Sequence, residues 1–427
     1  MSNSNKQSLS IKLNISVTKS KSNDTNNYEF SELSQKLTKK FSKDAKKNDG
    51  IFFTPPETVT KIITKIKSHK IDIIRILEPS CGSCEFINKL IKTFPDADIT
   101  GIEYNNIIFD SIKDKFKSYK NVELIKKDYI SYEETNKYDL IIGNPPYYVM
   151  KKSDTPNDYH DYFNGRPNIF ILFILKSLKL LTDEGVLSFV LPKNFLNCLY
   201  YDKTRKFINK QFKILHIENC SDEYIDTKQD TIMLIVQKQT NPENKSFILE
   251  VSDYTIFGNV SDIISLKKYY TEFTTLDKLG FTVNVGNIVW NQCKSILTND
   301  KSNTRLIYSS DIKDISEVTT YKNSAKKNYI NKSGESGPLL VINRGYGVGQ
   351  YKFEYCLIDV NYEYLIENHL ICIRPQSDIT KQKLITQYNR VIKSLSNKKT
   401  QDFIKLYFSN NAINTTELNY ILPIFNN

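Results

Sequence analysis

The sequence lacks the features that mark a secreted or membrane-embedded protein. No stretch approaches the roughly 20 consecutive apolar residues of a membrane-spanning helix. Residues 1–27 are polar and contain no apolar core of the kind found in secretory signals. The seven cysteines are scattered and odd in number. Without a secretory signal, such cysteines indicate a reducing compartment, so we expect a cytoplasmic protein with no membrane partner.

Metal-binding patterns are scarce as well. The four histidines are dispersed along the chain. The CxxC pair of Cys81 and Cys84 has no second CxxC or histidine pair to complete it. A structural zinc ion needs four ligands at suitable spacing. We therefore predict no metal site.

The overall composition indicates size and a class of partner. The chain has 427 residues, 40% of them hydrophobic, which predicts one large domain or two medium ones. Its net charge of +11 suits a polyanionic partner such as nucleic acid. A chain rich in Lys, Asn and Ile is also what an AT-rich genome encodes, so charge alone does not decide.

Strand-like and helix-like segments alternate through the first half. Apolar runs at 71–80, 97–104, 122–128, 138–146 and 186–192 predict strands, and the segments 84–94, 105–119 and 168–181 have helical length and spacing. This alternation predicts an α/β fold with a doubly wound, mostly parallel sheet. Two more strands, at 212–219 and 231–238, are too close together for a helical crossover, which favours an antiparallel end to the sheet.

The rhythm changes near residue 245. Before it, a polar helical segment at 28–50 precedes the first strand, and residues 1–27 have the composition of a disordered tail. Beyond it, short aromatic and Ile-rich runs alternate with polar loops. We therefore expect a tail at 1–27, a catalytic domain at 28–245, and a second domain of mixed α+β type at 246–427.

Acidic residues stand at the ends of three successive predicted strands. Glu78 is followed by a turn that opens a helix, where an open α/β sheet binds nucleotides. Glu103 ends the next strand, where a carboxylate can accept both hydroxyls of a ribose. Asp128 ends the third, where it can accept from an adenine amino group. The fourth strand runs into "NPPY", Asn144 to Tyr147, although proline cannot continue a sheet.

These motifs together resemble the amino-methylating DNA methyltransferases, which use S-adenosylmethionine and have the class I, Rossmann-like fold. "NPPY" is similar to the catalytic signature of that family. The order of "GIFFTPPETVTKII", "EPSCGSCEF", "GIEY", "KDY" and "NPPY" resembles the gamma subgroup of type II restriction-modification adenine-N6 methyltransferases. The resemblance covers about residues 40–240 well and extends more loosely to the end.

The resemblance implies a role for each matching residue. The methionine part of the cofactor would be held by Thr54, Glu78 and the backbone of residues 80–82. Glu103 would bind the ribose and Asp128 the adenine amino group, with Tyr104 and Phe173 on either side of the adenine ring. The implied cofactor-binding set is Thr54, Glu78, Pro79, Ser80, Cys81, Gly82, Glu103, Tyr104, Asp128, Tyr129 and Phe173.

The implied catalytic residues are Asn144, Pro145, Pro146 and Tyr147. An adenine amino nitrogen is a poor nucleophile because its lone pair is delocalised into the ring. Two acceptors, the Asn144 side-chain oxygen and the Pro145 carbonyl, can receive both N–H groups and free that lone pair for attack on the methyl group. The prolines aim the carbonyl in advance. Tyr147 offers a stacking face that offsets part of the cost of extruding the base.

Two further positions bear on this site. A second ring usually packs near the extruded base; Ile225 occupies the aligned position, and we predict that the neighbouring Tyr224 takes the role. The family commonly has a second glycine in its first motif, where this chain has Cys84. The added side chain could lower cofactor affinity, although the other motifs are intact.

The C-terminal domain is expected to recognise DNA. The segment 286–297 combines the one tryptophan with residues suited to base edges or phosphates, and 343–351 is a Gly-rich loop. Lys326, Lys327 and Lys332 can contact phosphates, although such charges usually only face solvent. The predicted DNA-binding residues are Trp290, Asn291, Gln292, Lys294, Arg344 and Tyr346.

The leading interpretation is a monomeric, site-specific methyltransferase of duplex DNA, with any cognate restriction endonuclease encoded separately, in a bacterial cytosol or in the cytoplasm of a virus-infected cell. DNA cytosine-N4 methylation uses the same chemistry. Protein glutamine-N5 methylation and RNA methylation do too, but they do not call for a second domain of this size. A degenerate relative that only binds DNA would rest on Cys84 alone.

Overall fold

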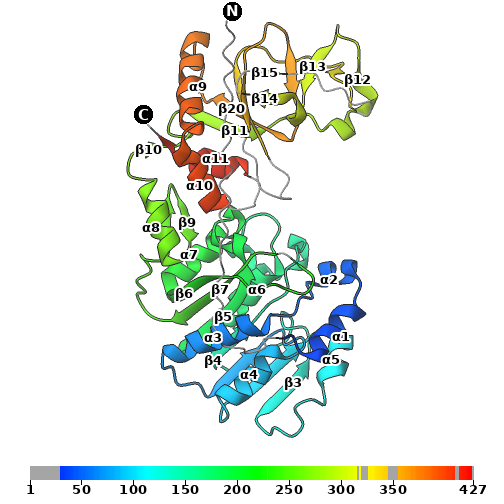
Figure 1. The fold of residues 1–427 in the computed structure, drawn as a ribbon, viewed down its shortest axis with the longest axis vertical. Helices are drawn as coiled ribbons and strands as arrows, with labels where there is room; N and C mark the ends of the chain where they lie inside the picture. Colours follow the sequence, from blue (N-terminus) through cyan, green and yellow to red (C-terminus); the bar gives the residue numbers. More distant parts are fainter. Residues whose placement is uncertain are drawn as a thin grey trace, which may run out of the picture.

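The computed structural model describes residues 29–227, 229–314, 317–318, 326–344, 354–408 and 413–425. The expected disorder of residues 1–27 thus concerns residues outside the described part. Figure 1 shows one large sheet with its helices in the lower half of the molecule and several small sheets in the upper half. Within the described ranges, no helix is both long and apolar enough to cross a membrane.

The large sheet has seven strands in the order β3-β2-β1-β4-β5-β7-β6. Its pairings are parallel from β3 to β5, and β7 runs antiparallel to both β5 and β6. The predicted mostly parallel sheet with an antiparallel end is therefore confirmed. The strands are β1 (Arg75–Glu78), β2 (Asp98–Glu103), β3 (Val122–Lys126), β4 (Tyr138–Gly143), β5 (Leu181–Pro192), β6 (Phe212–Cys220) and β7 (Thr231–Lys238).

Helices cover both faces of this sheet. Neighbouring residues of a strand point to opposite faces, so Leu140 packs into one core cluster and Ile141 into the other. Burial on both sides explains why these strands are apolar throughout. One face carries α3 (Pro56–Ser68), α4 (Glu85–Thr93) and α5 (Asn106–Ile112), and the other carries α6 (Ile169–Lys179) and α7 (Asp202–Gln211).

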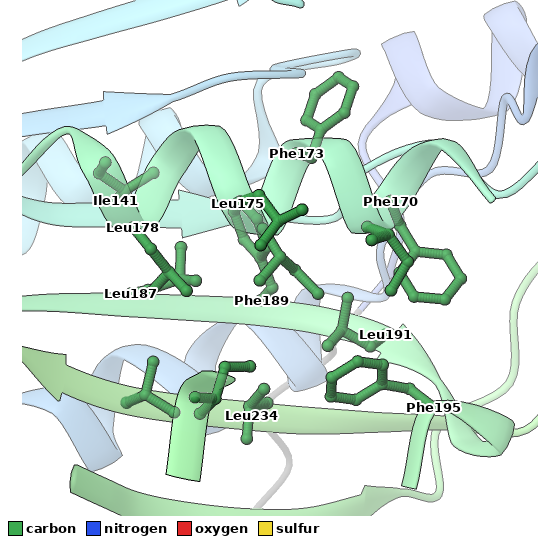
Figure 2. Packing of buried hydrophobic residues seen from close by; sticks show 14 of the residues in the cluster. Ile141, Phe170, Phe173, Leu175, Leu178, Leu187, Phe189, Leu191, Phe195 and Leu234 are labelled. Carbon is green, nitrogen blue, oxygen red and sulfur yellow. The ribbon is translucent and has the colours of Figure 1, made fainter. Parts of the chain in front are cut away.

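Helix α6 is apolar on nearly all sides because it is buried on nearly all sides. Figure 2 shows Phe170 and Leu175 directed at β5, while Phe173 lies on the side of α6 away from that strand. The helix was predicted at 168–181 and is confirmed at 169–179. The helix predicted at 105–119 was too long, since α5 ends at Ile112, and nothing in the side-chain pattern explains this early end.

Residues 182–185, which separate the predicted helix at 168–181 from the predicted strand at 186–192 and suggest a turn, are part of β5. The chain bulges there instead of ending the strand: Glu184 has φ 63°, and the register between β4 and β5 shifts at this point. Ahead of the sheet, the predicted helical segment at 28–50 forms α1 (Glu32–Lys40) and α2 (Lys43–Asp49). Ser42 caps α2, and Gly50 ends it in the left-handed conformation, with φ 65°.

The C-terminal region starts with the hairpin β8 (Ile248–Val251) and β9 (Tyr254–Phe257), followed by α8 (Val260–Lys268). Two four-stranded sheets, in the orders β11-β20-β17-β18 and β12-β16-β13-β19, and two small pairs follow. The mixed α+β character of this region is confirmed, while the boundary at 245/246 stays a prediction. The remaining elements are β10 (Phe273–Thr274), β11 (Phe281–Val285), β12 (Leu297–Thr298), β13 (Thr304–Ile307), β14 (Ile312–Asp314), β15 (Glu317–Val318), β16 (Tyr329–Ile330), β17 (Leu339–Asn343), β18 (Tyr355–Ile358), β19 (Tyr364–Ile366), β20 (Leu370–Pro375), β21 (Ile424–Phe425), α9 (Lys381–Leu395), α10 (Lys398–Phe408) and α11 (Thr415–Tyr420).

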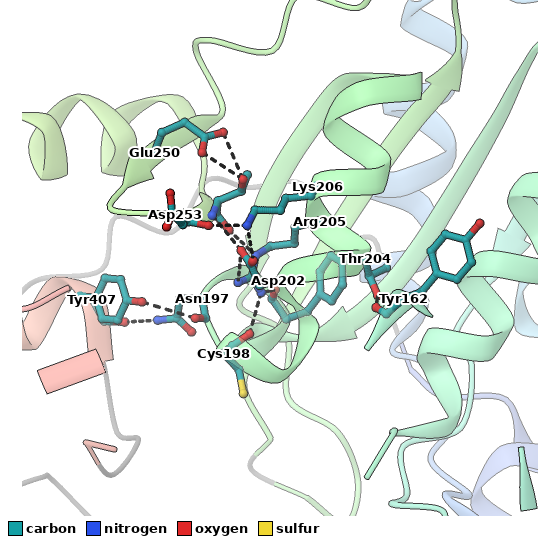
Figure 3. A network of polar contacts seen from close by, with 12 residues as sticks. Tyr162, Asn197, Cys198, Asp202, Thr204, Arg205, Lys206, Glu250, Asp253 and Tyr407 are labelled. Atoms are coloured by element: carbon teal, nitrogen blue, oxygen red, sulfur yellow. Dashed lines mark hydrogen bonds and ion pairs between the residues drawn. The ribbon is translucent and has the colours of Figure 1, made fainter. Parts of the chain in front are cut away.

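A buried polar junction joins this region to the large sheet (Figure 3). Arg205 on α7 is fully buried and donates from Nε to the carbonyl of Thr255 at 2.6 Å. Its Nη1 donates to the carbonyls of Phe195 and Cys198 at 2.9 and 2.8 Å. The Asn197 side chain, just beyond β5, donates to the Tyr407 carbonyl of α10 at 2.5 Å. Backbone carbonyls therefore receive most of the buried donors here.

Candidate active site

The predicted site residues meet at the carboxyl edge of the large sheet. Because β1, β2 and β4 are parallel neighbours, Glu78, Glu103 and Asn144 emerge at the same edge. The turn of residues 79–84, which we call the cofactor turn, follows β1. Its Gly82 N–H donates to Glu103 Oε2 at 2.9 Å, and the Asn105 N–H donates to Oε1 at 2.7 Å. Glu103 is thus held rigidly, with a lone pair left on each oxygen for a ligand.

Glu78 is buried without full hydrogen bonding. It is 2% exposed, and its Oε2 has no hydrogen-bond partner within the described ranges. Burial, with a smaller contribution from Cys84, raises the pKa of this carboxyl well above its usual value. A buried acceptor of this kind suits the ammonium group at the methionine end of S-adenosylmethionine. The residues present therefore fit the expected cofactor.

The other predicted cofactor residues lie around this edge with different exposures. Thr54 is 5% exposed and directly precedes α3, whereas Tyr104, just after β2, is 72% exposed. Asp128 is exposed beyond β3. Phe173 packs against Tyr129 with ring centroids 5.0 Å apart. The proposed adenine sandwich of Tyr104 and Phe173 stays a prediction.

Asn144 has its orientation set by three hydrogen bonds. Its Nδ2 donates to the carbonyl of Phe52 at 3.3 Å, and its backbone carbonyl accepts from Ser80 Oγ at 3.1 Å. Its Oδ1 accepts from the hydroxyl of Tyr147 at 2.6 Å. The amide therefore presents its oxygen, not its nitrogen, to the pocket. This is the orientation that accepting an N–H of a substrate requires.

The Tyr147 hydroxyl has two acceptors for its one proton. Besides Asn144 Oδ1 it lies 2.8 Å from the carbonyl of Val190 on β5. Its ring meets Phe170 edge-on, with centroids 6.0 Å apart. Burial raises the pKa of Tyr147 well above its usual value, so the hydroxyl keeps its proton. When this proton points to Asn144 Oδ1, it occupies the oxygen that a substrate amino group would use.

The N-terminal segment packs against residues 144–147, which we call the catalytic turn. A Cβ added at Gly50 would lie 2.7 Å from the backbone nitrogen of Tyr147 and 2.8 Å from Cβ of Pro146. Gly50 therefore allows this segment to approach the turn closely, and Phe52 then reaches Asn144. The sequence placed residues 50–63 near the cofactor but did not indicate their contact with Asn144, because no local pattern signals a bond across 92 residues.

Tyr224 lies near Tyr147 and Asn144, while Ile225 is 44% exposed. Tyr224 is 9% exposed, and its hydroxyl is buried with no hydrogen-bond partner in the described ranges. Burial raises the pKa of Tyr224, and the nearby side chains of Thr231 and Asn144 lower it by a smaller amount. Phe52, Phe53 and Tyr224 line a small cavity of about 10 Å³. The role of Tyr224 as the second ring beside the target base stays a prediction.

Cys84 occupies a position that favours glycine. It caps α4 in the left-handed conformation with φ 66° and is fully buried. Its neighbour Cys81 is 3% exposed, and the hydrogen bond with Cys84, together with burial, raises the pKa of the Cys81 thiol well above its usual value. A buried thiol with a raised pKa, such as that of Cys81, is unreactive.

The predicted DNA-binding residues are on separate elements. Trp290 lies in a short turn before β12, with the ammonium groups of Lys294 and Lys326 at 5.6 and 5.9 Å from its ring. Asn291, Gln292 and Lys294 are exposed beside it. Arg344 lines a cavity of about 240 Å³ together with Tyr200, which comes from the catalytic region. Tyr346 lies outside the described residues.

Sequence comparison assigns the family. The model of the Eco57I restriction-modification methylase family matches residues 3–227, which is more than half of the chain. The chain belongs to this family. It is a restriction-modification methylase, and its methyl donor is S-adenosylmethionine. The finer assignment to the gamma subgroup stays a prediction.

Two viral relatives match this methylase over nearly their whole length. The type II methyltransferase M.CvrRI of Paramecium bursaria Chlorella virus XZ-6E is 26% identical over 418 residues, covering 93% of this chain and 99% of the relative. The modification methylase CviBIII of Paramecium bursaria Chlorella virus NC1A is 26% identical over 410 residues, with the same coverage. The DrdV–DNA complex has a similar fold, with a TM-score of 0.50, 12% identity, and coverage of 88% of this chain and 55% of that one.

Proposed function

We propose that this methylase transfers the methyl group of S-adenosylmethionine to the N6 amino group of an adenine extruded from duplex DNA, at a specific site. The observation that carries the proposal is the orientation of Asn144, whose Oδ1 is held towards the pocket by the bond from Nδ2 to Phe52. The viral relatives, a type II methyltransferase and a modification methylase, support a DNA substrate.

The chemistry uses the chain's acceptors. S-adenosylmethionine supplies an electrophilic methyl group on a sulfonium. One N–H of the target amino group donates to Asn144 Oδ1 and the other to the carbonyl of Pro145, which draws the nitrogen towards a tetrahedral shape. The nitrogen then attacks the methyl carbon as the carbon–sulfur bond breaks, and the nitrogen loses its extra proton to water. Asn144 and Pro145 thus act by positioning and electrostatic preorganisation, without a general base.

The large-sheet region and the C-terminal region bind different parts of the reactants. Glu78 and Glu103 hold the ammonium and ribose groups of the cofactor. Tyr147 and Tyr224 supply aromatic faces for the target base, and such stacking is worth about 1–3 kcal/mol per base. Trp290 with its lysines and Arg344 contact DNA from the C-terminal region. We infer a protein that acts as a monomer, with any partner endonuclease on a separate chain.

Nucleoside mass spectrometry tests this proposal. Unmethylated DNA is incubated with S-adenosylmethionine and either the native protein or Asn144→Ala, and the digested nucleosides are analysed. We expect N6-methyladenine from the native protein and a loss of about 10²–10³-fold in the variant. Detection of N4-methylcytosine would keep the proposed mechanism but would identify cytosine as the target base. If the protein binds cofactor but methylates no DNA base, a protein or RNA substrate replaces the proposal.

A further inference from the structure

Two acidic residues tie the Tyr224 segment, residues 221–227, to the N-terminal helices. Asp222 Oδ2 accepts from Thr58 Oγ1 on α3 at 2.6 Å, and its Oδ1 accepts from Lys61 Nζ at 3.0 Å. Asp226 Oδ2 accepts from Lys46 Nζ on α2 at 2.5 Å. These carboxylates stand two residues before and two residues after Tyr224. The tyrosine is therefore held from both sides.

The Lys46–Asp226 pair is more than a surface contact. Lys46 is 8% exposed, and its ammonium also donates to the carbonyl of Thr38 at 3.0 Å. The side chain of Asp222 is 11% exposed. Exposed ion pairs contribute little because water screens them and both side chains must be ordered. Here one member of each pair, Lys46 or Asp222, is ordered by burial, while the side chains of Asp226 and Lys61 are 30% and 41% exposed. The buried member gives the segment a fixed point of attachment.

The same helices also contact the cofactor turn and the catalytic turn. Ser31 and Ser34 of the α1 end each approach Glu85 Oε1 at 2.5 Å, just after the cofactor turn. Phe52, between α2 and α3, accepts from Asn144. Residues 31–61 therefore form one support for the cofactor turn, the catalytic asparagine and the Tyr224 segment.

The Tyr224 hydroxyl shows why tethers are needed. It is buried close to the side chains of Thr231 and Asn144, and a buried hydroxyl with incomplete hydrogen bonding gains free energy by moving outward into water. The ion pairs at Asp222 and Asp226 oppose that movement.

We propose that Asp222 and Asp226 are positioning residues that hold Tyr224 against Asn144, so that the target base enters a pocket whose second wall is already in place. This role rests on the proposed function. It concerns the base side of the pocket and leaves cofactor binding untouched.

Methyl transfer by variants of the full chain tests the role. We expect Asp226→Asn and Lys46→Met each to lower kcat about tenfold, because small misplacements near the reacting atoms are costly. KM for S-adenosylmethionine should change less than about twofold, and the double variant should lose no more than either single one. Asp222→Ala should lower kcat in the same way.

A fluorescent base gives a second measurement that general destabilisation would not mimic. With 2-aminopurine at the target position, we expect a different emission in the variants when bound, since the base no longer meets Tyr224 in the same geometry. Asp183→Asn is the matched control. It removes the ion pair with Lys238, which is 2.9 Å long and joins strand ends remote from the site. It should leave both measurements unchanged.

The outcomes separate this role from the proposed function. Native kcat and native 2-aminopurine emission in an Asp222→Ala/Asp226→Asn double variant would overturn the role while the methylation itself stands. A raised cofactor KM with unchanged kcat would also overturn it, since the helices would then serve the cofactor turn alone. Failure of the native protein to methylate any DNA would overturn the proposed function and this role with it.

Discussion

The carboxyl edge of the large sheet and the junction with the C-terminal region both bury polar side chains, but they satisfy them differently. At the edge, Glu78 Oε2 and the Tyr224 hydroxyl have no hydrogen-bond partner within the described residues. At the junction, Arg205 donates three hydrogen bonds to backbone carbonyls, and its Nη2, although it makes none, lies 3.8 Å from Asp202 (Figure 3).

The difference separates a ligand site from a permanent contact. A buried polar group without a partner costs free energy, and a bound ligand that pairs with it can return that cost. A buried group paired within the chain holds two elements together. We therefore expect the reactants to bind at the unpaired groups of the sheet edge, Glu78 and Tyr224. The hydrogen bonds of Arg205 at the junction hold the C-terminal region in place. Four substitutions test the distinction, beginning with the largest expected effect.

Glu417 on α11 is an exception to the comparison. It lies near Arg205 at the junction, yet burial destabilises its ionised form. It is 5% exposed, and burial raises its pKa to about 7 from 4.5. Because the folded-state pKa is the higher one, its stabilising contribution is complete below pH 4.5 and is lost as pH rises through about 7. At pH 8 we expect Glu417→Gln to be more stable than the native protein by about 3 kcal/mol.

Urea unfolding at pH 4.5 and pH 8 measures this effect. The variant and the native protein should have similar free energies of unfolding at the lower pH. Asp402→Asn, which removes a half-buried carboxylate on the neighbouring α10, serves as the control. Equal stability of Glu417→Gln and native protein at pH 8 would mean that the junction compensates this carboxylate fully.

Glu78 sharpens the comparison from the ligand side. Glu78→Gln removes the charge that would meet the cofactor's ammonium, so we expect the Kd for S-adenosylmethionine to rise about 10- to 100-fold. The native affinity should fall as pH is lowered, since the raised pKa of Glu78 makes cofactor binding release a proton. Calorimetry in buffers of different ionisation enthalpy measures both. Unchanged affinity in Glu78→Gln would contradict an ammonium contact.

Arg344 tests whether the C-terminal region contributes binding alone. Arg344→Ala should raise the Kd for DNA about tenfold and reduce its salt dependence by about one counterion. Cofactor affinity should not change, because Glu78 and Glu103 belong to other elements. Fluorescence anisotropy with labelled duplex at several salt concentrations measures the effect, and Arg390→Ala, on the exposed side of α9, is the control. An equal loss of DNA affinity in both variants would indicate that Arg344 acts only through the overall positive charge of the protein and makes no specific contact.

Cys84 gives the smallest expected effect. Cys84→Gly relieves the left-handed strain but loses a buried side chain, so the free energy of unfolding should change by less than about 1 kcal/mol. Cys81→Ala loses packing without any such relief and should be the more destabilised of the two. Thermal unfolding of both variants checks this order. A larger loss in Cys84→Gly would show that the thiol contributes more than its strain costs.

The features that follow from hydrophobic periodicity and strand order could mostly be predicted from the sequence. Parallel strands deliver their last residues to one edge, so finding Glu78, Glu103 and Asn144 at strand ends was enough to predict that they meet. The sequence could not predict contacts that depend on packing between distant segments, such as Lys46 with Asp226 across 180 residues. The C-terminal strands are mostly two to six residues long, too short for periodicity to place Trp290 relative to Arg344.

The catalytic turn has a consequence for the order in which the chain is made. Phe52 leaves the ribosome well before Asn144, whereas Val190, the second acceptor of Tyr147, leaves later, and Tyr224 later still. A nascent chain that has just completed "NPPY" therefore lacks Val190, the second acceptor of the Tyr147 hydroxyl, and lacks Tyr224. We expect no fragment ending before residue 227 to be catalytic, even if it contains every motif residue. A fragment of that kind should regain activity only when the missing strands are supplied as a second piece.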